Sequence, residues 1–425
     1  MAKILIIGGG AAGMAAAVFL GEKNHQVHLF EKNEKLGKKL FITGKGRCNI
    51  TNTCDDETFF KSVVTNAKFL YSAFYGYSNQ DVVSFFENLG LAVKEERGGR
   101  IFPVSDHSSD VIRILEKRMK ELDVKVHLKS EAEALLTEEG ENGERKIKGV
   151  RLRNGAEILG EKVIVATGGF SYQATGSTGD GYTFAKEAGH TVTQLRPALV
   201  PIATKEEYVT QMQGLALKNI RFTVKDGKKV LYDDFGELLF THFGISGPLV
   251  LTASSYIGKK LEKKELQGYI DLKAALTEEQ LDARLLREFE AGINRQFKNV
   301  ITGMFPAKLY PVILELGGIA PDKKVNEITR KERQDFIHLV KHFPLTLVEL
   351  RPFREAIITQ GGVKVKEINP KTMESKLVKG LYFIGEVLDL DAVTGGFNLQ
   401  IAWSTAKAAA EFIEGERERR RWQLT

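Results

Sequence analysis

The chain has 425 residues, of which 43% are hydrophobic and 27% charged, and its formal net charge is +6. This composition is ordinary for a globular protein and excludes a mainly disordered, collagen-like or membrane-embedded chain. The mild positive charge is compatible with an anionic ligand or RNA but requires neither. Two cysteines are too few for a disulfide scaffold, and nothing reads as a zinc cluster, so we expect no metal site.

The N-terminal sequence leads directly into an apolar run, without the charged leader and cleavage site of a secretory signal. No stretch approaches the ~18 uninterrupted apolar residues of a membrane span. We therefore expect a cytoplasmic protein with no membrane contact. Its oligomeric state is left open.

The first predicted unit is a strand, a glycine turn and a helix. Residues 3–7 are a short apolar run, as in a buried parallel strand, and Ala-rich sequence follows the glycines to about Gly21. A second strand over 26–30 ends at Glu31. Apolar residues recur with helical spacing further along the chain. These segments are residues 58–75, 80–90 and 109–122.

Strand patterns return at 124–128, 147–152 and 162–165, and 191–275 holds short alternating runs typical of a small β-barrel. Residues 277–341 are predicted to be helical. Thr277 with Gln280, and Thr329 with Glu332, have the capping-box spacing that starts helices.

Strand and glycine-turn patterns resume after about residue 355, which indicates a nucleotide-binding domain interrupted by an insert. The predicted fold is α/β, a discontinuous Rossmann-like nucleotide-binding domain with an inserted β-barrel and a small helical domain. Its predicted parts are 1–190, the barrel 191–276, the helices 277–341, a return segment 342–355, and 356–425.

The dinucleotide fingerprint is Gly8-x-Gly10-x-x-Gly13, which follows a strand and opens a helix. Gly8 permits the tight turn, Gly10 lets the backbone approach a pyrophosphate, and Gly13 lets the helix pack on the strand. The helix N-terminus offers unpaired N–H groups to the phosphates. Glu31 suits ribose hydroxyls and would repel a 2′-phosphate, which favours FAD or NAD over NADP.

Later glycine turns decide between FAD and NAD. Strand 162–165 meets Ala166-Thr167-Gly168, the last strand ends at Gly385-Glu386, and Gly395-Gly396 opens the last helix. A ligand that spans all of these is long, as FAD is. The N-terminus of the last helix would point its positive end at the flavin and stabilise the anionic reduced form.

Five longer segments also resemble a known family: residues 6–13, 43–52, 175–182, 240–248 and 385–400. They are similar to the NAD(P)/FAD-dependent oxidoreductases of the aminoacetone oxidase-like and bile-acid dehydroxylation flavoprotein type, and more distantly to glutathione-reductase-clan flavoproteins. The resemblance implies an FAD domain interrupted by a barrel and a helical insert. Many of the distant relatives have Asp in the ribitol motif where this chain has Glu386.

The resemblance places the basic segment 35–52 along the FAD. With the fingerprint and the later turns, it gives one set of expected FAD-binding residues. They are Gly8, Gly10, Ala11, Ala12, Gly13, Glu31, Lys32, Lys38, Lys39, Gly46, Arg47, Cys48, Asn49, Ala132, Ala166, Thr167, Gly168, Gly385, Glu386, Gly396, Phe397, Asn398 and Leu399.

The catalytic candidate is His242, whose imidazole can exchange a proton near neutral pH. Cys48 is either a redox partner of the flavin or small packing beside it, and packing is favoured. Arg351 and Arg354 would hold a carboxylate or make ion pairs. The tail 417–422 would touch RNA or a membrane surface, or be a solvated helix end, which is favoured.

The leading hypothesis is an FAD-dependent oxidoreductase that transfers a hydride between flavin N5 and an unidentified small molecule. A reduced pyridine nucleotide, NADH or NADPH, would dock only transiently, because no second Rossmann fingerprint is evident. The alternatives are a tRNA-modifying FAD protein and a flavin-bound regulator without catalysis. No nucleic-acid partner is expected, since aromatic and basic residues do not interleave.

Overall fold

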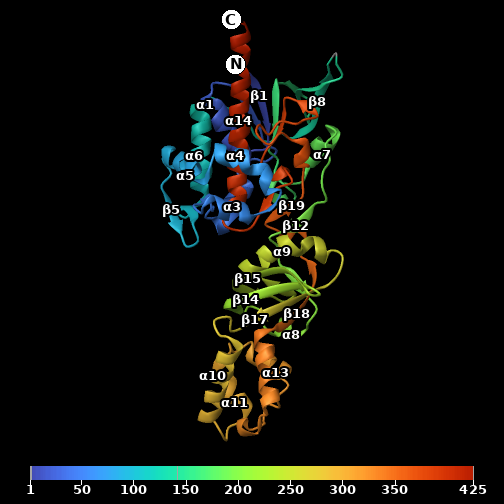
Figure 1. Cartoon of the computed structure of the whole chain (residues 1–425). Helices are drawn as coiled ribbons and strands as arrows, with labels where there is room; N and C mark the ends of the chain where they lie inside the picture. The colour runs from blue at the N-terminus through green and yellow to red at the C-terminus, as the bar shows by residue number, and fades with distance from the viewer. Residues whose placement is uncertain (1, 141, 425) are drawn as a thin grey trace. The chain divides into compact units, whose positions relative to one another are not determined.

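The computed structural model describes residues 2–140 and 142–424, with side chains described through residue 415. The side chains of the tail 417–422 therefore lie outside the described part. The chain divides into two compact units, the first formed by residues 1–197 and 357–425 and the second by residues 198–356. Figure 1 traces both units in chain order. No helix among the described residues is long and apolar enough to cross a membrane.

The first unit is built on a five-stranded parallel sheet in the order β21-β11-β1-β2-β7. The run Lys3–Ile7 forms β1 at its centre, and four of its five residues are buried. Strands buried on both faces need apolar residues throughout, which explains the lack of alternation. The other strands are β2 (Gln26–Phe30), β7 (Lys125–His127), β11 (Lys162–Val165) and β21 (Leu381–Phe383).

Three helices of the first unit form its main helical contacts. Helix α1 (Ala11–Glu22) packs against α14 (Phe397–Leu424) and α6 (Ser108–Glu121). Its small residues are buried almost without interruption, so it can lie close to its neighbours. The indole of Trp403 on α14 is 1% exposed and donates a hydrogen bond of 2.9 Å to the carbonyl of Ile50.

The first unit also contains a second, mixed sheet. Its antiparallel strands are β8 (Ala132–Glu139), β9 (Arg145–Leu152) and β10 (Glu157–Leu159), and the short β20 (Val378–Lys379) pairs with β9 in parallel. The remaining helices of this unit are α2 (Lys38–Ile42), α3 (Asp56–Ser62), α4 (Tyr71–Gly76), α5 (Asn79–Asn88) and α7 (Asp180–Glu187). Its remaining strands are β3 (Thr51–Asn52), β4 (Val63–Thr65), β5 (Val93–Glu96), β6 (Arg100–Pro103), β19 (Ile358–Gln360) and β22 (Asp391–Ala392), with β12 (Arg196–Ala198) at the unit boundary.

The helical pattern over 58–75 is confirmed only in part. The chain there forms α3, the strand β4, a 3-10 turn (Ala67–Leu70) and α4, and β4 pairs with β22 from the far end of the sequence. This distant pairing overrides the local helical periodicity.

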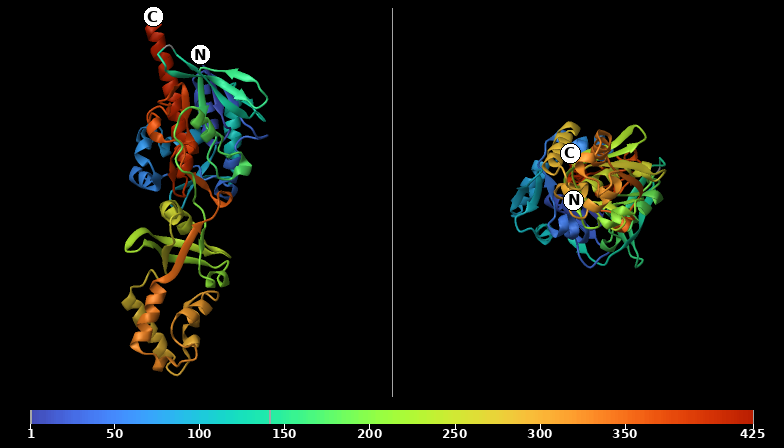
Figure 2. Two further views of the ribbon diagram at one scale, coloured as in Figure 1. Left: turned by 90° about the vertical axis from the view of Figure 1, so that its right-hand side faces the viewer. Right: turned by 90° about the horizontal axis from the view of Figure 1, so that it is seen from below.

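The second unit contains the predicted β-barrel and helices. Six strands close into an antiparallel barrel in the order β13-β16-β15-β14-β17-β18. The hairpin of β14 (Ala216–Asp226) and β15 (Lys229–Phe240) turns at Gly227-Lys228. In the left-hand view of Figure 2 the hairpin is yellow-green and β18 orange. The other strands are β13 (Ile202–Thr204), β16 (Gly244–Ser246), β17 (Leu266–Asp271) and β18 (Phe343–Leu350).

Helices α10 (Glu278–Ala291) and α13 (Arg330–Lys341) both begin at predicted capping boxes. The Thr277 and Thr329 side chains each accept a hydrogen bond from the backbone N–H three residues on, and the reciprocal bonds to Gln280 and Glu332 are present. The unit's other helices are α8 (Tyr208–Gln211), α9 (Pro248–Leu261), α11 (Phe297–Ile301) and α12 (Tyr310–Leu316). The structure thus confirms an α/β Rossmann-like fold with a barrel and helical insert.

Candidate FAD site

The candidate site lies where four neighbouring parallel strands end. Because β1, β2, β11 and β21 run in one direction, their carboxyl ends meet at one edge of the sheet. This brings together the turn after Ile7, the acid Glu31, the turn 166–169 and Gly385-Glu386. Segments separated by more than three hundred residues therefore form one edge.

The glycines of the fingerprint have different tasks. A Cβ on Gly8, whose φ is +106°, would lie 2.5 Å from the carbonyl oxygen of Ala166, so the β1 and β11 turns touch there. A Cβ on Gly13 would lie 1.9 Å from the carbonyl oxygen of Gly8, so this glycine sets how closely α1 approaches β1. A Cβ on Gly10 would meet nothing within 4 Å. Open space thus lies at the N-terminus of α1.

The first turn of α1 faces this edge. Gly10 is the N-cap of α1, and the first intrahelical bond runs from the N–H of Met14 to the carbonyl of Gly10. The N–H groups of Ala11, Ala12 and Gly13 therefore have no carbonyl of the preceding turn to donate to. Together with the helix dipole, they suit a pyrophosphate placed over Gly10.

The carboxylate of Glu31 is oriented so that it can bind a sugar hydroxyl. One carboxylate oxygen, Oε2, accepts a 2.8 Å hydrogen bond from the N–H of Gly9, and Oε1 accepts from the N–H and Nδ2 of Asn33 at 2.8 and 2.7 Å. A carboxylate has about four lone-pair directions, so one remains for a hydroxyl. The side chain is buried, 8% exposed. The sequence reading missed Asn33, whose only signal was its position two residues after Glu31.

Ala132 follows a backbone segment that contacts Glu31. It begins β8, and the N–H of Ser130 just before it donates to the carbonyl of Glu31 at 2.9 Å. Nζ of Lys32 lies 2.5 Å from Oδ2 of Asp180 and also contacts Thr178. Lys32 is therefore occupied by the start of α7.

Glu386 and Lys39 form an ion pair at the centre of the edge. Nζ of Lys39 lies 2.6 Å from Oε2 of Glu386 and 2.8 Å from Oγ of Ser171, and Oε1 of Glu386 accepts from the N–H of Thr359 at 3.0 Å. Gly385, at φ +72°, lies close to Ala12, because a Cβ there would be 2.9 Å from the Cβ of Ala12. Sequence reasoning missed Ser171 and Thr359, which stand outside every motif.

The last helix meets the segment 49–52. A Cβ on Gly396, φ +101°, would lie 2.5 Å from the carbonyl of Thr51 and 3.0 Å from Oδ1 of Asn49. Phe397, Asn398 and Leu399 supply the first-turn N–H groups of α14. The Asn398 side chain is already engaged, because Oδ1 accepts from the N–H of Ala392 and Nδ2 donates to its carbonyl.

Two of the predicted FAD-binding residues form ion pairs within the protein. Arg47 pairs with Oε2 of Glu96 at 2.7 Å and Oδ1 of Asp106 at 3.3 Å, and it stacks 4.0 Å from the ring centroid of Phe102. Lys38 lies 3.3 Å from Oδ1 of Asn33 and 3.5 Å from Oε1 of Glu34. The charge of either residue is largely balanced by protein groups. Gly46, at φ +83°, has open space around it.

Cys48 is fully buried, and burial raises the pKa of its thiol to about 12. The sulfur is therefore a neutral thiol at physiological pH. This favours the packing role over a redox role.

The second unit carries His242 and the two arginines. His242 is exposed between β15 and β16 and makes an edge contact with the ring of Phe243. Arg351 forms a bidentate pair with Glu355, at 2.9 and 3.2 Å, and lies 4.3 Å from the centroid of Phe243. Arg354 is exposed. Arg351 thus makes the ion pair rather than presenting an empty carboxylate site.

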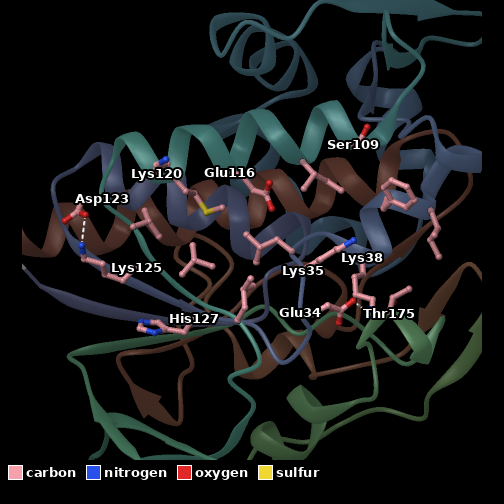
Figure 3. A pocket seen from close by; sticks show the side chains of 18 residues that line it. Glu34, Lys35, Lys38, Ser109, Glu116, Lys120, Asp123, Lys125, His127 and Thr175 are labelled. Atoms are coloured by element: carbon pink, nitrogen blue, oxygen red, sulfur yellow. Dashed lines mark hydrogen bonds and ion pairs between the residues drawn. The ribbon is translucent and has the colours of Figure 1, made fainter.

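A cavity of about 1050 Å³ opens beside this edge, between α6 and residues 34–42. Figure 3 shows Glu116 and Lys120 on α6 above it and His127 below. Among the expected FAD-binding residues it includes Lys38 alone. The cavity is therefore separate from the glycine turns.

The residues at the edge fit an FAD. The space over Gly10 suits a phosphate, and two buried polar atoms, Oγ1 of Thr167 and Oδ1 of Asn49, have no hydrogen-bond partner among the described residues. A nucleotide would bring the polar groups that these atoms lack. Together the interrupted Rossmann domain and its edge define an FAD-dependent oxidoreductase.

The chain belongs to the HI0933-like protein Rossmann domain family, whose model matches residues 2–412. It is 33% identical over 419 residues to the 3-dehydro-bile acid delta(4,6)-reductase of Clostridium scindens, covering 97% of this chain and 100% of that protein. It is also 33% identical over 408 residues to the ribosomal RNA dihydrouridine synthase of Haemophilus influenzae, covering 96% and 97%.

Solved structures share the fold at low identity. The 3-ketosteroid delta1-dehydrogenase of Sterolibacterium denitrificans matches with a TM-score of 0.53 and 14% identity, covering 98% of this chain and all of that chain. The 3-ketosteroid-delta4-(5alpha)-dehydrogenase of Rhodococcus jostii matches with a TM-score of 0.52 and 13% identity, covering 96% of both. These matches show that the chain shares its fold with two 3-ketosteroid dehydrogenases.

Proposed function

We propose that this flavoenzyme reduces a carbon–carbon double bond conjugated to a carbonyl group in a small molecule, with NADH or NADPH as the electron donor. The proposal rests on a chemical property that two relatives share. A 3-dehydro-bile acid delta(4,6)-reductase acts, by its name, on double bonds in line with a C3 ketone. A dihydrouridine synthase saturates the uracil double bond next to a carbonyl. Both names describe reduction of one electronic arrangement in different molecules.

Bound FAD would supply the two-electron redox chemistry that links a nicotinamide donor to the conjugated substrate. The chain's part is to hold and orient the cofactor. The turn 8–13 and the N-terminus of α1 would hold the pyrophosphate, and Glu31 would bind a ribose hydroxyl. Glu386, fixed by Lys39, would bind a ribitol hydroxyl.

The electrostatics of the last helix support reduction. The positive end of α14, at Phe397, would stabilise negative charge on the reduced cofactor. The remaining expected FAD-binding residues belong to the same proposal.

Transfer to a conjugated substrate also requires a proton at the carbon α to the carbonyl, and His242 is the proposed donor.

The test is an anaerobic titration of the FAD-loaded chain with NADH and, separately, NADPH, followed by the visible flavin absorption. Reduced enzyme is then mixed with 2-cyclohexenone or a 3-oxo-4-ene steroid. We expect bleaching by a nicotinamide and reoxidation by the enone with formation of the saturated ketone. Bleaching without enone turnover would contradict the substrate class, and no bleaching by either nucleotide would contradict the donor.

RNA is the second candidate substrate, because the ribosomal RNA dihydrouridine synthases of Haemophilus influenzae and Escherichia coli are 33% and 31% identical to this chain. Incubation of the reduced enzyme with ribosomal RNA that lacks dihydrouridine distinguishes an RNA substrate from a small-molecule substrate. Dihydrouridine found by mass spectrometry, without turnover of the free enones, would replace the small molecule by RNA. Salt-dependent binding would accompany it.

A further inference from the structure

The second unit contains a cluster of two histidines and a glutamate on two helices. His338 lies in the last turn of α13, His342 is the residue that caps the C-terminus of this helix, and Glu278 is the first residue of α10. One ligand atom from each of the three lies within 4.8 Å of the others. The cluster belongs to no part of the FAD chemistry, and the sequence reading, guided by cysteines, expected no metal site.

Helical geometry sets up the histidine pair. Residues four apart lie on the same face, one turn above the other. The N–H of His342 donates to the carbonyl of His338 at 2.8 Å, so the helical turn extends to His342. The ring centroids are 4.5 Å apart and inclined by 27°. Nδ1 of His342 is buried and has no hydrogen-bond partner among the described residues.

Glu278 is available as the third ligand. Its neighbours in the capping box are Thr277 and Gln280, which bond to each other, so the Glu278 carboxylate is not the capping group. Helices α10 and α13 pack together, which brings the start of one to the end of the other. Glu278 and His338 are exposed and His342 is half-buried, so water can complete the coordination.

We propose that Glu278, His338 and His342 form a binding site for a divalent transition metal, with Zn²⁺ as the ion of best fit. Two imidazole nitrogens and one carboxylate oxygen form a ligand set typical of zinc. Bonds of about 2.0–2.1 Å place tetrahedral ligand atoms roughly 3.4 Å apart, so modest side-chain rotations would close the present separations. The bound ion would link the start of α10 to the end of α13.

The experiment is equilibrium dialysis of the untagged, FAD-loaded full chain against Zn²⁺ after treatment with a chelator, with metal measured by atomic emission. We expect one Zn²⁺ per chain with a Kd of about 10 µM or tighter. His338→Ala and His342→Ala should weaken binding at least about tenfold, and Glu278→Gln by about tenfold. Glu279→Gln, on the next residue of the same turn, is the matched control and should bind as the parent does.

Two results would overturn the site. Absence of bound metal at about 100 µM free Zn²⁺ would exclude it at useful affinity. Stoichiometric binding that His338→Ala and His342→Ala leave unchanged would assign the ion to other ligands, such as the thiol of Cys54. Each variant is first checked for bound FAD and an unchanged circular dichroism spectrum, and His338→Gln or His342→Gln replaces an alanine variant that does not fold.

Discussion

Nζ of Lys39 lies 2.6 Å from Oε2 of Glu386, although the two residues are 347 positions apart in the sequence. Their side chains are 19% and 21% exposed, so the pair is largely removed from solvent. Lys39 comes from the basic segment after β2, and Glu386 from the turn after β21. The pair therefore joins the two halves of the interrupted domain at the edge where we propose that FAD binds.

We expect Glu386→Gln to raise the dissociation constant for FAD about tenfold. The amide can still accept the N–H bond of Thr359, but it removes the negative charge that fixes Lys39. Removing one partner of a partly buried pair also leaves the other charge uncompensated. Flavin fluorescence quenching during titration of the apoprotein measures the affinity.

A double-mutant cycle with Lys39→Met tests whether the pair acts as a unit. Coupling of about 1 kcal/mol or more is expected for groups in direct contact. Additive effects of the two substitutions would show that each residue contributes separately.

Gly10 and Gly13 should respond differently to alanine. A Cβ at Gly10 meets nothing within 4 Å, and φ there is −82°. The Gly10→Ala apoprotein should therefore be as stable as the parent or more stable by a few tenths of a kcal/mol. The added methyl occupies the space proposed for the pyrophosphate, so FAD affinity should fall tenfold or more. Thermal unfolding of the apoprotein and FAD titration measure the two effects.

Gly13→Ala is the contrasting variant. Its Cβ would lie 1.9 Å from the carbonyl oxygen of Gly8, so α1 must shift and the apoprotein should lose about 1–3 kcal/mol. If Gly10→Ala bound FAD as tightly as the parent, the phosphate would not lie over Gly10.

The features that the sequence predicted well are local ones. The glycine turns at the ends of β1, β11 and β21 follow apolar runs directly, and the capping boxes at Thr277 and Thr329 need only a three-residue spacing. Parallel strands then place the turns at one edge. Such features require no knowledge of distant contacts.

The features that the sequence did not predict depend on distant partners. Residues 63–65 form a strand instead of a helical turn because Asp391–Ala392 pairs with them. The sequence also did not reveal that Arg47, whose contact with FAD stays a prediction, forms ion pairs with Glu96 and Asp106. Glu278 and the pair of histidines on α13 meet only because their helices pack together. Neither periodicity nor charge along the chain reports these pairings.

Cys48→Ala should leave flavin reduction by the nicotinamide within about twofold of the parent rate. Burial raises the pKa of the Cys48 thiol to about 12, and only the thiolate is a good nucleophile. Alanine keeps a small apolar group at the left-handed backbone position, where φ is +60°. Stopped-flow absorption under anaerobic conditions measures the rate. A loss of more than tenfold, with FAD still bound, would assign the thiol a redox role.

His242→Gln should slow product formation from an enone about tenfold or more, while leaving flavin reduction by the nicotinamide within about twofold. Glutamine cannot deliver a proton, and general acid catalysis contributes about 10²–10⁴-fold where it operates. The side chain is exposed, so the substitution should not disturb folding. Separate stopped-flow measurements of the two half-reactions distinguish them. Equal slowing of both would indicate a role in binding rather than proton transfer.

Asp391 should make folding stability fall as the pH rises. Burial raises the pKa of its carboxyl from the ordinary 3.8 to about 6, against hydrogen bonds from Thr65 and Gln360. The folded chain therefore holds this proton more tightly than the unfolded chain. The stabilisation that results is complete below about pH 3.8 and is lost as the pH rises through about 6. A shift of this size corresponds to a loss of at most about 3 kcal/mol.

Asp391→Asn removes that titration while keeping the size of the side chain and an oxygen that can accept from Gln360. The variant should be more stable than the parent at pH 8, by about 1–3 kcal/mol, and nearly equal to it at about pH 4. Denaturant unfolding of both proteins across this pH range measures the difference in their free energies of unfolding. The titration of all other groups is common to both proteins and cancels in this difference. A stability difference that did not change with pH would mean that the buried carboxyl has an ordinary affinity for its proton.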